Sequence, residues 1–369
     1  MYELVVIEDL KGLEAIRNDW EKIHSTQENK HFYESYGWFY SYTKNLKTEK
    51  TVFFCVKVES KIVAIIPLQY YVSSYYFFKV NFLQAFDNEH FMFNGIIFAS
   101  SCNKREIVTV FLKLLSSTEY KKWHVLKWSK LIGFSSLLLD ENYQSIRMIH
   151  AEGKKYQIKK IRSDISDEKI IPKSLYKSIR RYRNRISRAG EFRLKINLVN
   201  EKNLVCFKRF LDLEASGWKG EAGSKSAIKL STNLLNFYLS LITNLPDSSN
   251  VYIFELLLNE ESIASAYTII DGETAYGCKI GYNEKHSNLA PGKLLDYYLL
   301  IHLKNELDIK ELNFTSDANW QREWGVTINT ITDIIVYKNN FIAYVHYSFT
   351  KAKLFLKKII RAANTKRSR

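Results

Sequence analysis

Residues 276–295, YGCKIGYNEKHSNLAPGKLL, constrain the fold most, because a β-patterned run leads through a polar loop into Pro-Gly-Lys and then into an apolar helix. The first amide groups of a helix have no partner within it and carry the positive end of the helix dipole, so they can bind a phosphate or pyrophosphate. Pro291 suits a helix start, Gly292 lets a ligand approach the backbone, and Lys293 adds a cation. An ordinary strand-to-helix turn would have the same pattern.

The size and composition of the chain indicate two folded domains. Its 369 residues are too many for one comfortable core, and a hydrophobic content of 46% can fill two. The four cysteines are far apart, with no CxxC and no paired histidine, so the sequence predicts neither a zinc site nor a disulfide framework. No apolar stretch reaches about 18 residues and no secretory leader is visible, so we expect a cytoplasmic protein.

The formal net charge of +15 is concentrated in two segments. Residues 172–188, PKSLYKSIRRYRNRISR, contain seven Lys or Arg and no acid, and their apolar residues recur at helical spacing. Residues 349–369 predict a basic amphipathic helix that runs into a polar tail. Each segment could meet nucleic acid, anionic lipid or a phosphorylated substrate, or could be a solvated helix.

Hydrophobic periodicity in the second half predicts one order of elements: a strand, two helices, a three-stranded meander, a helix, a short strand and two more strands. Asp271-Gly272 supplies a hairpin turn within the meander. A short helical segment, DANWQREWG, precedes the last two strands. The predicted ranges are 194–198, 204–213, 228–242, 251–258, 262–270, 274–281, 293–307, 311–315, 331–337 and 341–347.

The first half has a fainter version of this pattern. Residues 51–60 and 61–71 predict two strands about a short turn, but no Pro-Gly helix start appears in residues 1–165. Asp87, Asn88 and His90 are polar residues among aromatics, which could face a cleft; we prefer to interpret them as a polar loop. The first half is therefore expected to shape an acceptor cleft rather than to bind a cofactor.

Four motifs occur in an order typical of a known family. They are SGWKGEAGSK, the hairpin ELLLNEESIASAYTIIDGETAYGCKIGYNE, LAPGKLL and FTSDANWQREWG. In these motifs the chain resembles the GNAT acyl-CoA N-acyltransferase superfamily, and more closely the bacterial CelD-like acetyltransferases associated with cellulose and exopolysaccharide gene clusters. The resemblance covers most of residues 170–340. The fingerprint Arg/Gln-x-x-Gly-x-Gly/Ala is present in part, with Ser287 and Ala290 at its first two positions, and Trp320-Gln321 stand where the group commonly has Tyr-Lys.

The resemblance implies an α/β fold with mixed sheets, built from tandem GNAT-like domains. Residues 1–165 would be a degenerate domain that shapes the acceptor cleft. Residues 166–348 would be the complete, acyl-CoA-binding catalytic domain, and residues 349–369 the basic amphipathic helix and tail.

The resemblance also implies a site. Acyl transfer from a thioester needs positioning and oxyanion stabilisation, together with a group that deprotonates the acceptor. Asp317 is the first candidate base, although it could instead cap the short helix that follows. Glu214 and Glu284 are the next candidates, and Tyr282 could protonate the departing thiolate. The implied cofactor-binding residues are Lys279, Ile280, Gly281, Ser287, Ala290, Pro291, Gly292 and Lys293, and the implied acceptor-binding residues are Trp218, Lys219 and Trp320.

The expected function is direct transfer of an acyl group, most simply acetyl, from acyl-CoA to an amine or hydroxyl of a sugar nucleotide or cell-envelope polysaccharide precursor. Acetyl-CoA would be the cosubstrate, and no metal would take part. One alternative is a Fem-like transferase that uses aminoacyl-tRNA, in which residues 172–188 would contact RNA. Another is a non-enzymatic scaffold, which the C-terminal helix would hold at the inner face of an anionic membrane.

Overall fold

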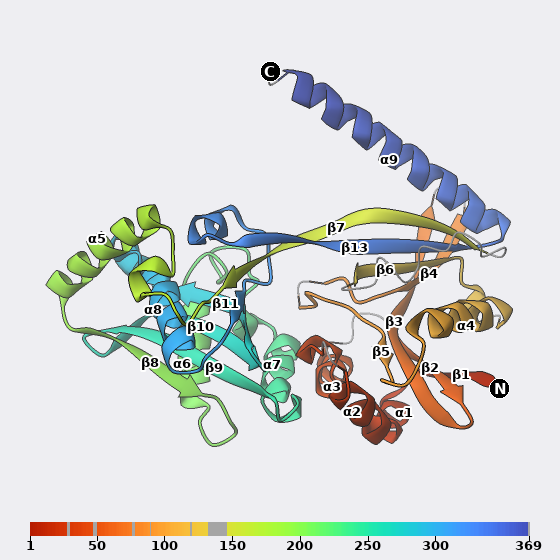
Figure 1. Ribbon diagram of the computed structural model, residues 1–369, viewed down its shortest axis with the longest axis horizontal. Helices are drawn as coiled ribbons and strands as arrows, with labels where there is room; N and C mark the ends of the chain where they lie inside the picture. Colours follow the sequence, from red (N-terminus) through yellow and green to blue (C-terminus); the bar gives the residue numbers. More distant parts are fainter. Residues whose placement is uncertain are drawn as a thin grey trace. The chain divides into compact units, whose positions relative to one another are not determined.

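The computed structural model describes residues 1–27, 30–46, 50–75, 78–88, 90–118, 120–131 and 146–367. The chain forms two compact units (Figure 1). The first unit contains residues 1–29, 48–153 and 331–369, and the second contains residues 30–47 and 154–330. A short segment near the N-terminus, residues 30–47, thus belongs to the second unit, and residues 331–369 belong to the first. The domain boundaries at 165 and 348 stay predictions.

The second unit is built on a mixed sheet. Its strands lie in the order β8-β9-β10-β11-β12-β7, and among the described pairs of this unit only β11/β12 is parallel. The strands are β8 (Phe192–Leu198), β9 (Ser249–Leu258), β10 (Glu261–Asp271), β11 (Thr274–Tyr282), β12 (Glu311–Asn313) and β7 (Ile146–Lys160).

Helices cover both faces of this sheet. Successive residues of a strand point to opposite faces, and Ala266 packs in the cluster around α8, whereas the Tyr267 ring contacts Phe207 and Phe210 of α6. Helix α5 packs outside α8, as Figure 1 shows, and α3 packs against α7. The helices are α3 (Tyr36–Asn45), α5 (Lys173–Ala189), α6 (Val205–Glu214), α7 (Thr232–Asn244) and α8 (Pro291–Asn305), with the short η1 (Phe32–Glu34), η3 (Asp167–Lys169), η4 (Ile228–Leu230), η5 (Glu284–Leu289) and η6 (Asn319–Trp324).

The first unit repeats this order of elements. Its strands lie in the order β1-β2-β3-β4-β6-β13, and its parallel pair, β4 and β6, is joined through a helix just as β11 and β12 are. The fold is therefore the predicted α/β tandem. The elements are β1 (Tyr2–Ile7), α1 (Leu10–Ala15), α2 (Arg17–Ser25), β2 (Lys50–Val58), β3 (Lys61–Tyr75), β4 (Phe78–Gln84), β5 (Ile97–Phe98), α4 (Lys104–Ser117), η2 (Tyr120–Lys122), β6 (Val125–Leu131), β13 (Thr327–Lys338) and α9 (Phe341–Arg367).

One predicted element is wrong. Residues 341–347 form the start of α9 and not a strand. Their alternating pattern also fits a helix, since Ala343, His346 and Tyr347 fall on one face, and the Asn340 side chain accepts a hydrogen bond from the Ala343 amide at 2.9 Å, which caps the helix. The predicted polar tail ends in residues 368–369, which lie outside the described residues. Within the described part of the chain, no helix combines the length and apolar character that a bilayer crossing needs.

Candidate active site

Strand β11 has an open edge beyond its pairing with β12. The two strands pair only where residues 274–276 of β11 face residues 311–313 of β12. A register shift against β10 then leaves Cys278 as an extra residue in β11, a β-bulge. No described strand pairs with residues 278–282 on the side away from β10. This edge therefore offers backbone groups to an extended ligand.

The start of α8 lies next to the end of this strand and is not closed by a side chain. Its N-cap, Ala290, makes no side-chain cap, and its first turn contains no acid. A Cβ on Gly292 would meet only Cδ1 of Tyr282, at 3.7 Å, and otherwise open space. The first amides of α8 can therefore receive an anion.

Ala290 explains one departure from the family fingerprint. Its φ of 53° lies in the left-handed region, which a residue with a Cβ adopts at a cost of about 1 kcal/mol. Glycine, the usual residue at this position of the fingerprint, adopts this conformation freely. The turn into α8 therefore has the backbone that the fingerprint requires, although the residue differs.

The corresponding helix of the first unit, α4, is closed at its start. The Asn103 side chain accepts hydrogen bonds from the amides of Arg105 and Glu106 at 3.1 and 3.2 Å, and Glu106 puts an acid into the first turn. An incoming phosphate would have to displace this cap and approach a like charge. The two units therefore share a topology but differ in the helix start that could bind an anion.

Glu214 and Lys219 hold the loop after α6 against β11. The Glu214 carboxylate accepts a hydrogen bond from the Ile228 amide at 2.9 Å and pairs with the Lys219 ammonium at 3.2 Å. Lys219 also donates to the Ile280 carbonyl at 3.1 Å. A Cβ on Gly281 would lie 2.7 Å from the Glu214 Cα, so only glycine allows this approach. Glu214 is 2% exposed, and its contacts anchor the loop.

The other predicted residues near this strand are more open. Trp218 is 64% exposed, and the Lys219 ammonium lies 5.8 Å from the centroid of its ring. Glu284 is exposed beside Gly217, and Tyr282 is 39% exposed. The structure thus brings Trp218, Lys219, Tyr282 and Glu284 to the end of β11.

The predicted cofactor residues form a continuous stretch from the bulge to α8. Lys279, Ile280 and Gly281 follow the bulge in β11, and Ser287 is exposed in η5. Pro291 is buried at the first position of α8. This stretch joins the open strand edge to the uncapped helix start.

Asp317 and Trp320 lie beyond the end of β12. The side-chain amide of Gln157 donates a hydrogen bond to Oδ1 of Asp317 at 2.5 Å, and the Arg322 guanidinium lies 3.5 Å from the same oxygen. Asp317 does not cap η6, since the N-cap is Ala318. Trp320 is 44% exposed and packs edge-on against Phe314.

Hydrogen bonds connect the segment after β12 to both neighbouring strands. The Thr315 hydroxyl donates to the Gly277 carbonyl at 3.1 Å, which ties the segment to β11 next to the bulge. The backbone amide of Gln157 in β7 donates a hydrogen bond to the Ser316 carbonyl at 3.0 Å. Asp317 therefore follows a segment that is fixed to both strands.

Lys293 and Asp296 extend the site into the first two turns of α8. Lys293 pairs with Glu323 of η6 at 2.7 Å. Asp296 is buried, and this burial, with a smaller contribution from Glu323, raises its pKa to about 7. Sequence reasoning missed Asp296, although a single acid within the apolar run LLDYYLL is a visible signal.

His31 is a second residue that sequence reasoning missed. Its Nδ1 lies 2.9 Å from the hydroxyl of Tyr276 in β11. Burial lowers the pKa of His31, although Asp271 and Glu311 act in the opposite direction, so the imidazole is neutral at pH 7. A neutral, half-buried histidine next to β11 can accept a proton.

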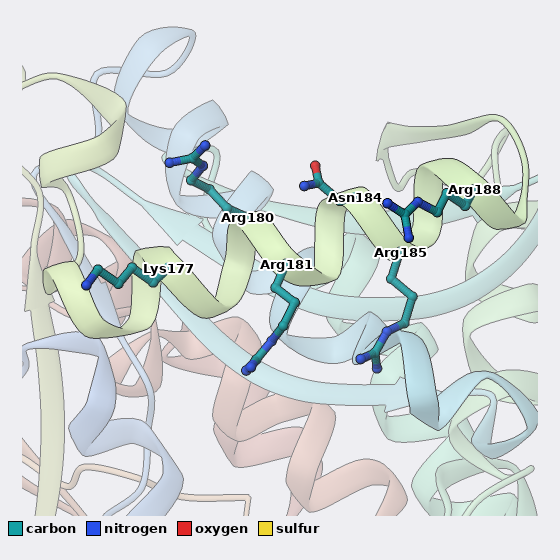
Figure 2. Close-up of a pocket in the computed structure, with 6 residues that line it drawn as sticks. All are labelled: Lys177, Arg180, Arg181, Asn184, Arg185 and Arg188. Carbon is teal, nitrogen blue, oxygen red and sulfur yellow. The ribbon is translucent and has the colours of Figure 1, made fainter.

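A row of cations covers the outer face of α5. Arg185 donates to the Asn288 carbonyl in η5, just before α8. In Figure 2, Arg181 and Arg185 point the same way from the helix and Arg180 points the opposite way. No described acid pairs with these side chains, whose face lies opposite the buried Leu175 and Ile179. The residues line a hollow of about 410 Å³ and are Lys177, Arg180, Arg181, Asn184, Arg185 and Arg188.

The polar loop of the first unit is mostly engaged in its own contacts. Asp87 pairs with Lys130 at 3.1 Å, and the Lys130 ammonium also donates to the carbonyls of Asn88 and Phe91. The His90 amide donates to the Asn88 side chain. The described residues include no group of three His, Cys, Asp or Glu side chains that could hold a metal ion.

Comparisons with known proteins identify the class. Residues 173–322 match the acetyltransferase (GNAT) domain family. This part of the chain is a GNAT acetyltransferase domain, and the chain is an acyltransferase with tandem GNAT architecture. Acyl-CoA is the usual cosubstrate of this fold.

Solved structures share the fold over most of the chain. The crystal structure of FemX has 10% sequence identity, covers 92% of this chain and 98% of its own, and has a TM-score of 0.58. A tandem GNAT protein from the clavulanic acid biosynthesis pathway has 9% identity, coverage of 92% and 99%, and a TM-score of 0.50. The C-terminal domain of a putative lysylphosphatidylglycerol synthetase from Agrobacterium fabrum has 10% identity, coverage of 93% and 96%, and a TM-score of 0.50. No curated protein sequence matches the chain.

Proposed function

We propose that the protein transfers an acyl group, in the simplest case acetyl, from acyl-CoA to an amine or hydroxyl of a sugar nucleotide or cell-envelope polysaccharide precursor, as in the CelD-like group that its motifs resemble. The observation that carries this proposal is the uncapped start of α8 beside the open edge of β11. The closed start of α4 supports placing the cosubstrate in the second unit.

Acyl-CoA brings phosphates, an extended amide-containing arm and an activated thioester carbonyl. The amides of Gly292 and Lys293 would hold the pyrophosphate, and the edge of β11 from residue 278 to 282 would receive the arm. Backbone amides at the bulge would stabilise the oxyanion that forms at the carbonyl. Positioning and electrostatic stabilisation would then supply most of the acceleration, without a covalent enzyme intermediate.

Two groups are candidates for the base that deprotonates the acceptor. Asp317 is a carboxylate at the end of β12, and its tethered segment contacts β11 next to the bulge. His31 is a neutral imidazole that contacts β11 through Tyr276. The exposed Trp218 and Trp320 could border the sugar of the acceptor.

The proposal predicts release of the CoA thiol only when an acceptor is present. Acetyl-CoA and a panel of amino-sugar nucleotides would be incubated with the protein, and free thiol measured. If Asp317 is the base, Asp317→Asn should lower kcat by about 100-fold, because positioned bases contribute on that order, while the Kd for acetyl-CoA stays within about twofold. If His31 is the base, His31→Gln should show this loss instead, together with loss of the acidic limb of the pH profile. A wild-type protein that neither binds acyl-CoA nor releases thiol would contradict the proposal.

A second candidate function is transfer from aminoacyl-tRNA, which is favoured by the cations on α5. These cations lack acidic partners in the described chain and are mostly arginine, which binds phosphate in a bidentate manner. The row of cations lies next to η5, just before the start of α8, because Arg185 donates a hydrogen bond to the Asn288 carbonyl. An RNA donor would therefore reach the same strand edge from this side.

This second function predicts tRNA binding that depends on α5. The triple variant Arg180→Gln, Arg181→Gln and Arg188→Gln should reduce the slope of log K against log salt by about 2 to 3, since each lost phosphate contact removes up to about 0.9. The matched control is Lys11→Gln, Lys22→Gln and Lys113→Gln, which removes the same charge from exposed positions of the first unit. Equal slopes for wild type and the α5 variant would exclude the α5 surface as an RNA site.

A further inference from the structure

Helix α9 exposes large apolar side chains to solvent. Phe341 is 79% exposed, Phe355 is 66% exposed and Leu356 is 58% exposed. Tyr344 and Phe349 are also about half exposed. Single exposed apolar residues are ordinary, but five within 16 consecutive residues of one helix form a patch that needs an explanation.

These residues lie on one face of the helix. The opposite face packs on β4, β6 and β13 of the first unit through Ala343, Tyr347 and Leu354. At 100° per residue, which follows from about 3.6 residues per turn, the exposed residues fall on the side away from this packed face. The helix therefore contributes one face to the core of its unit and presents a second apolar face outward.

Cations flank the outward face. Lys351 and Lys353 are exposed on either side of it, and residues 341–367 contain no Asp or Glu. The sequence continues with Lys357, Lys358 and Arg361. An apolar stripe bordered by cations on an acid-free helix is the pattern of a helix that lies in a membrane interface, where the stripe enters the acyl region and the cations meet anionic headgroups.

The charge argues against a second copy of the chain as the occupant of this face. Two α9 helices would bring two acid-free basic faces together, so their cations would repel each other. The row of cations on α5 is a different kind of surface from the exposed face of α9. The outward face of α5 consists of charged and polar residues, so it has no large apolar side chain to insert into a membrane.

We propose that α9 docks the protein on an anionic phospholipid surface, with Phe355 and Leu356 inserted and Lys351 and Lys353 at the headgroups. This attachment goes beyond acyl transfer and does not depend on the identity of the donor or the acceptor. It also differs from the scaffold interpretation of the sequence, because it adds a membrane contact to an enzyme.

The test is co-sedimentation of the full-length protein with vesicles of phosphatidylcholine alone or mixed with phosphatidylglycerol. The wild type should bind only the mixed vesicles. Lys351→Gln with Lys353→Gln should weaken binding by about 30-fold, from about a fivefold contribution per cation. Phe355→Ser with Leu356→Ser should weaken it by about 100-fold. Because these four side chains are exposed or border solvent, thermal unfolding should be unchanged.

Matched controls show whether vesicle binding depends on the α9 face or only on the overall charge and hydrophobicity of the protein. Lys11→Gln with Lys22→Gln removes the same charge from exposed positions of the first unit, and Leu198→Ser with Val205→Ser removes exposed apolar side chains from the second. Both controls should bind like the wild type. The proposal would be overturned if the wild type did not bind mixed vesicles, or if the α9 variants bound as well as the controls. It would also be overturned if the wild type formed a dimer that Phe355→Ser with Leu356→Ser dissociated.

Discussion

Gly292→Trp should weaken acetyl-CoA binding by at least about 100-fold in isothermal titration. A Cβ at residue 292 would meet only the edge of the Tyr282 ring, so the new side chain can be accommodated by the fold and would project into the open space before the first amides of α8. An indole in this space would block the approach of a pyrophosphate to those amides. Loss of two or more charge-assisted hydrogen bonds corresponds to a change of this size.

Gly292→Ala is the matched control for this experiment. Its single methyl group fits the space at 3.7 Å from Tyr282, and alanine favours a helix, so the variant should fold at least as stably and bind within about tenfold of the wild type. If Gly292→Trp bound acetyl-CoA with wild-type affinity, the start of α8 would be excluded as the cosubstrate site. Unchanged thermal unfolding of both variants would show that the loss arises at the site.

The sequence predicted the elements around the site because local patterns determine them. The meander, its Asp271-Gly272 turn and the Pro-Gly start of α8 each follow from residues within a few positions of one another. The strand prediction for residues 341–347 was wrong because alternation over a short run also fits a helix. The Asn340 cap distinguishes the two, and Asn340 lies between the two runs that the sequence predicts as strands.

The site itself was predictable where the chain supplies it locally or where a family motif contains its residues, as it does Trp218 and Lys219. Tyr282 and Gly292 are ten positions apart and lie together in the structure. His31 was missed because 245 positions separate it from Tyr276, and because a segment from the first half of the chain packs into the second unit. No periodicity or motif links such distant residues in a single sequence.

The two units show how similar topologies can differ at the helix start that could bind an anion. Both have a helix between the members of a parallel strand pair, yet Asn103 and Glu106 close one helix start, whereas Ala290 leaves the other open. The difference depends on a few residues at one turn. Topology alone would therefore allow a cosubstrate site in either unit, and the capping residues favour the second unit in our proposal.

Asp296→Asn should remove a large pH-dependent penalty from folding. Burial raises the pKa of Asp296 from 3.8 to about 7 in the folded protein. Below about pH 4 the carboxyl is protonated in both states and costs nothing. Between about pH 4 and 7 the unfolded chain ionises while the folded protein keeps its proton, so wild-type stability falls as the pH rises, by roughly 4 kcal/mol in total at about 1.4 kcal/mol per unit.

Asparagine is neutral throughout this range, so the variant should gain stability relative to the wild type as the pH rises from 4 to 8. Urea unfolding at several pH values measures this difference directly. Asp212→Asn is the control, because Asp212 is exposed and pairs only at the surface with Lys229, so its effect should stay within about 1 kcal/mol at every pH. A constant difference between wild type and Asp296→Asn would mean that the carboxylate is already stabilised in the folded protein, which would make Asp296 part of the charged surface of the site rather than a buried acid that binds a proton.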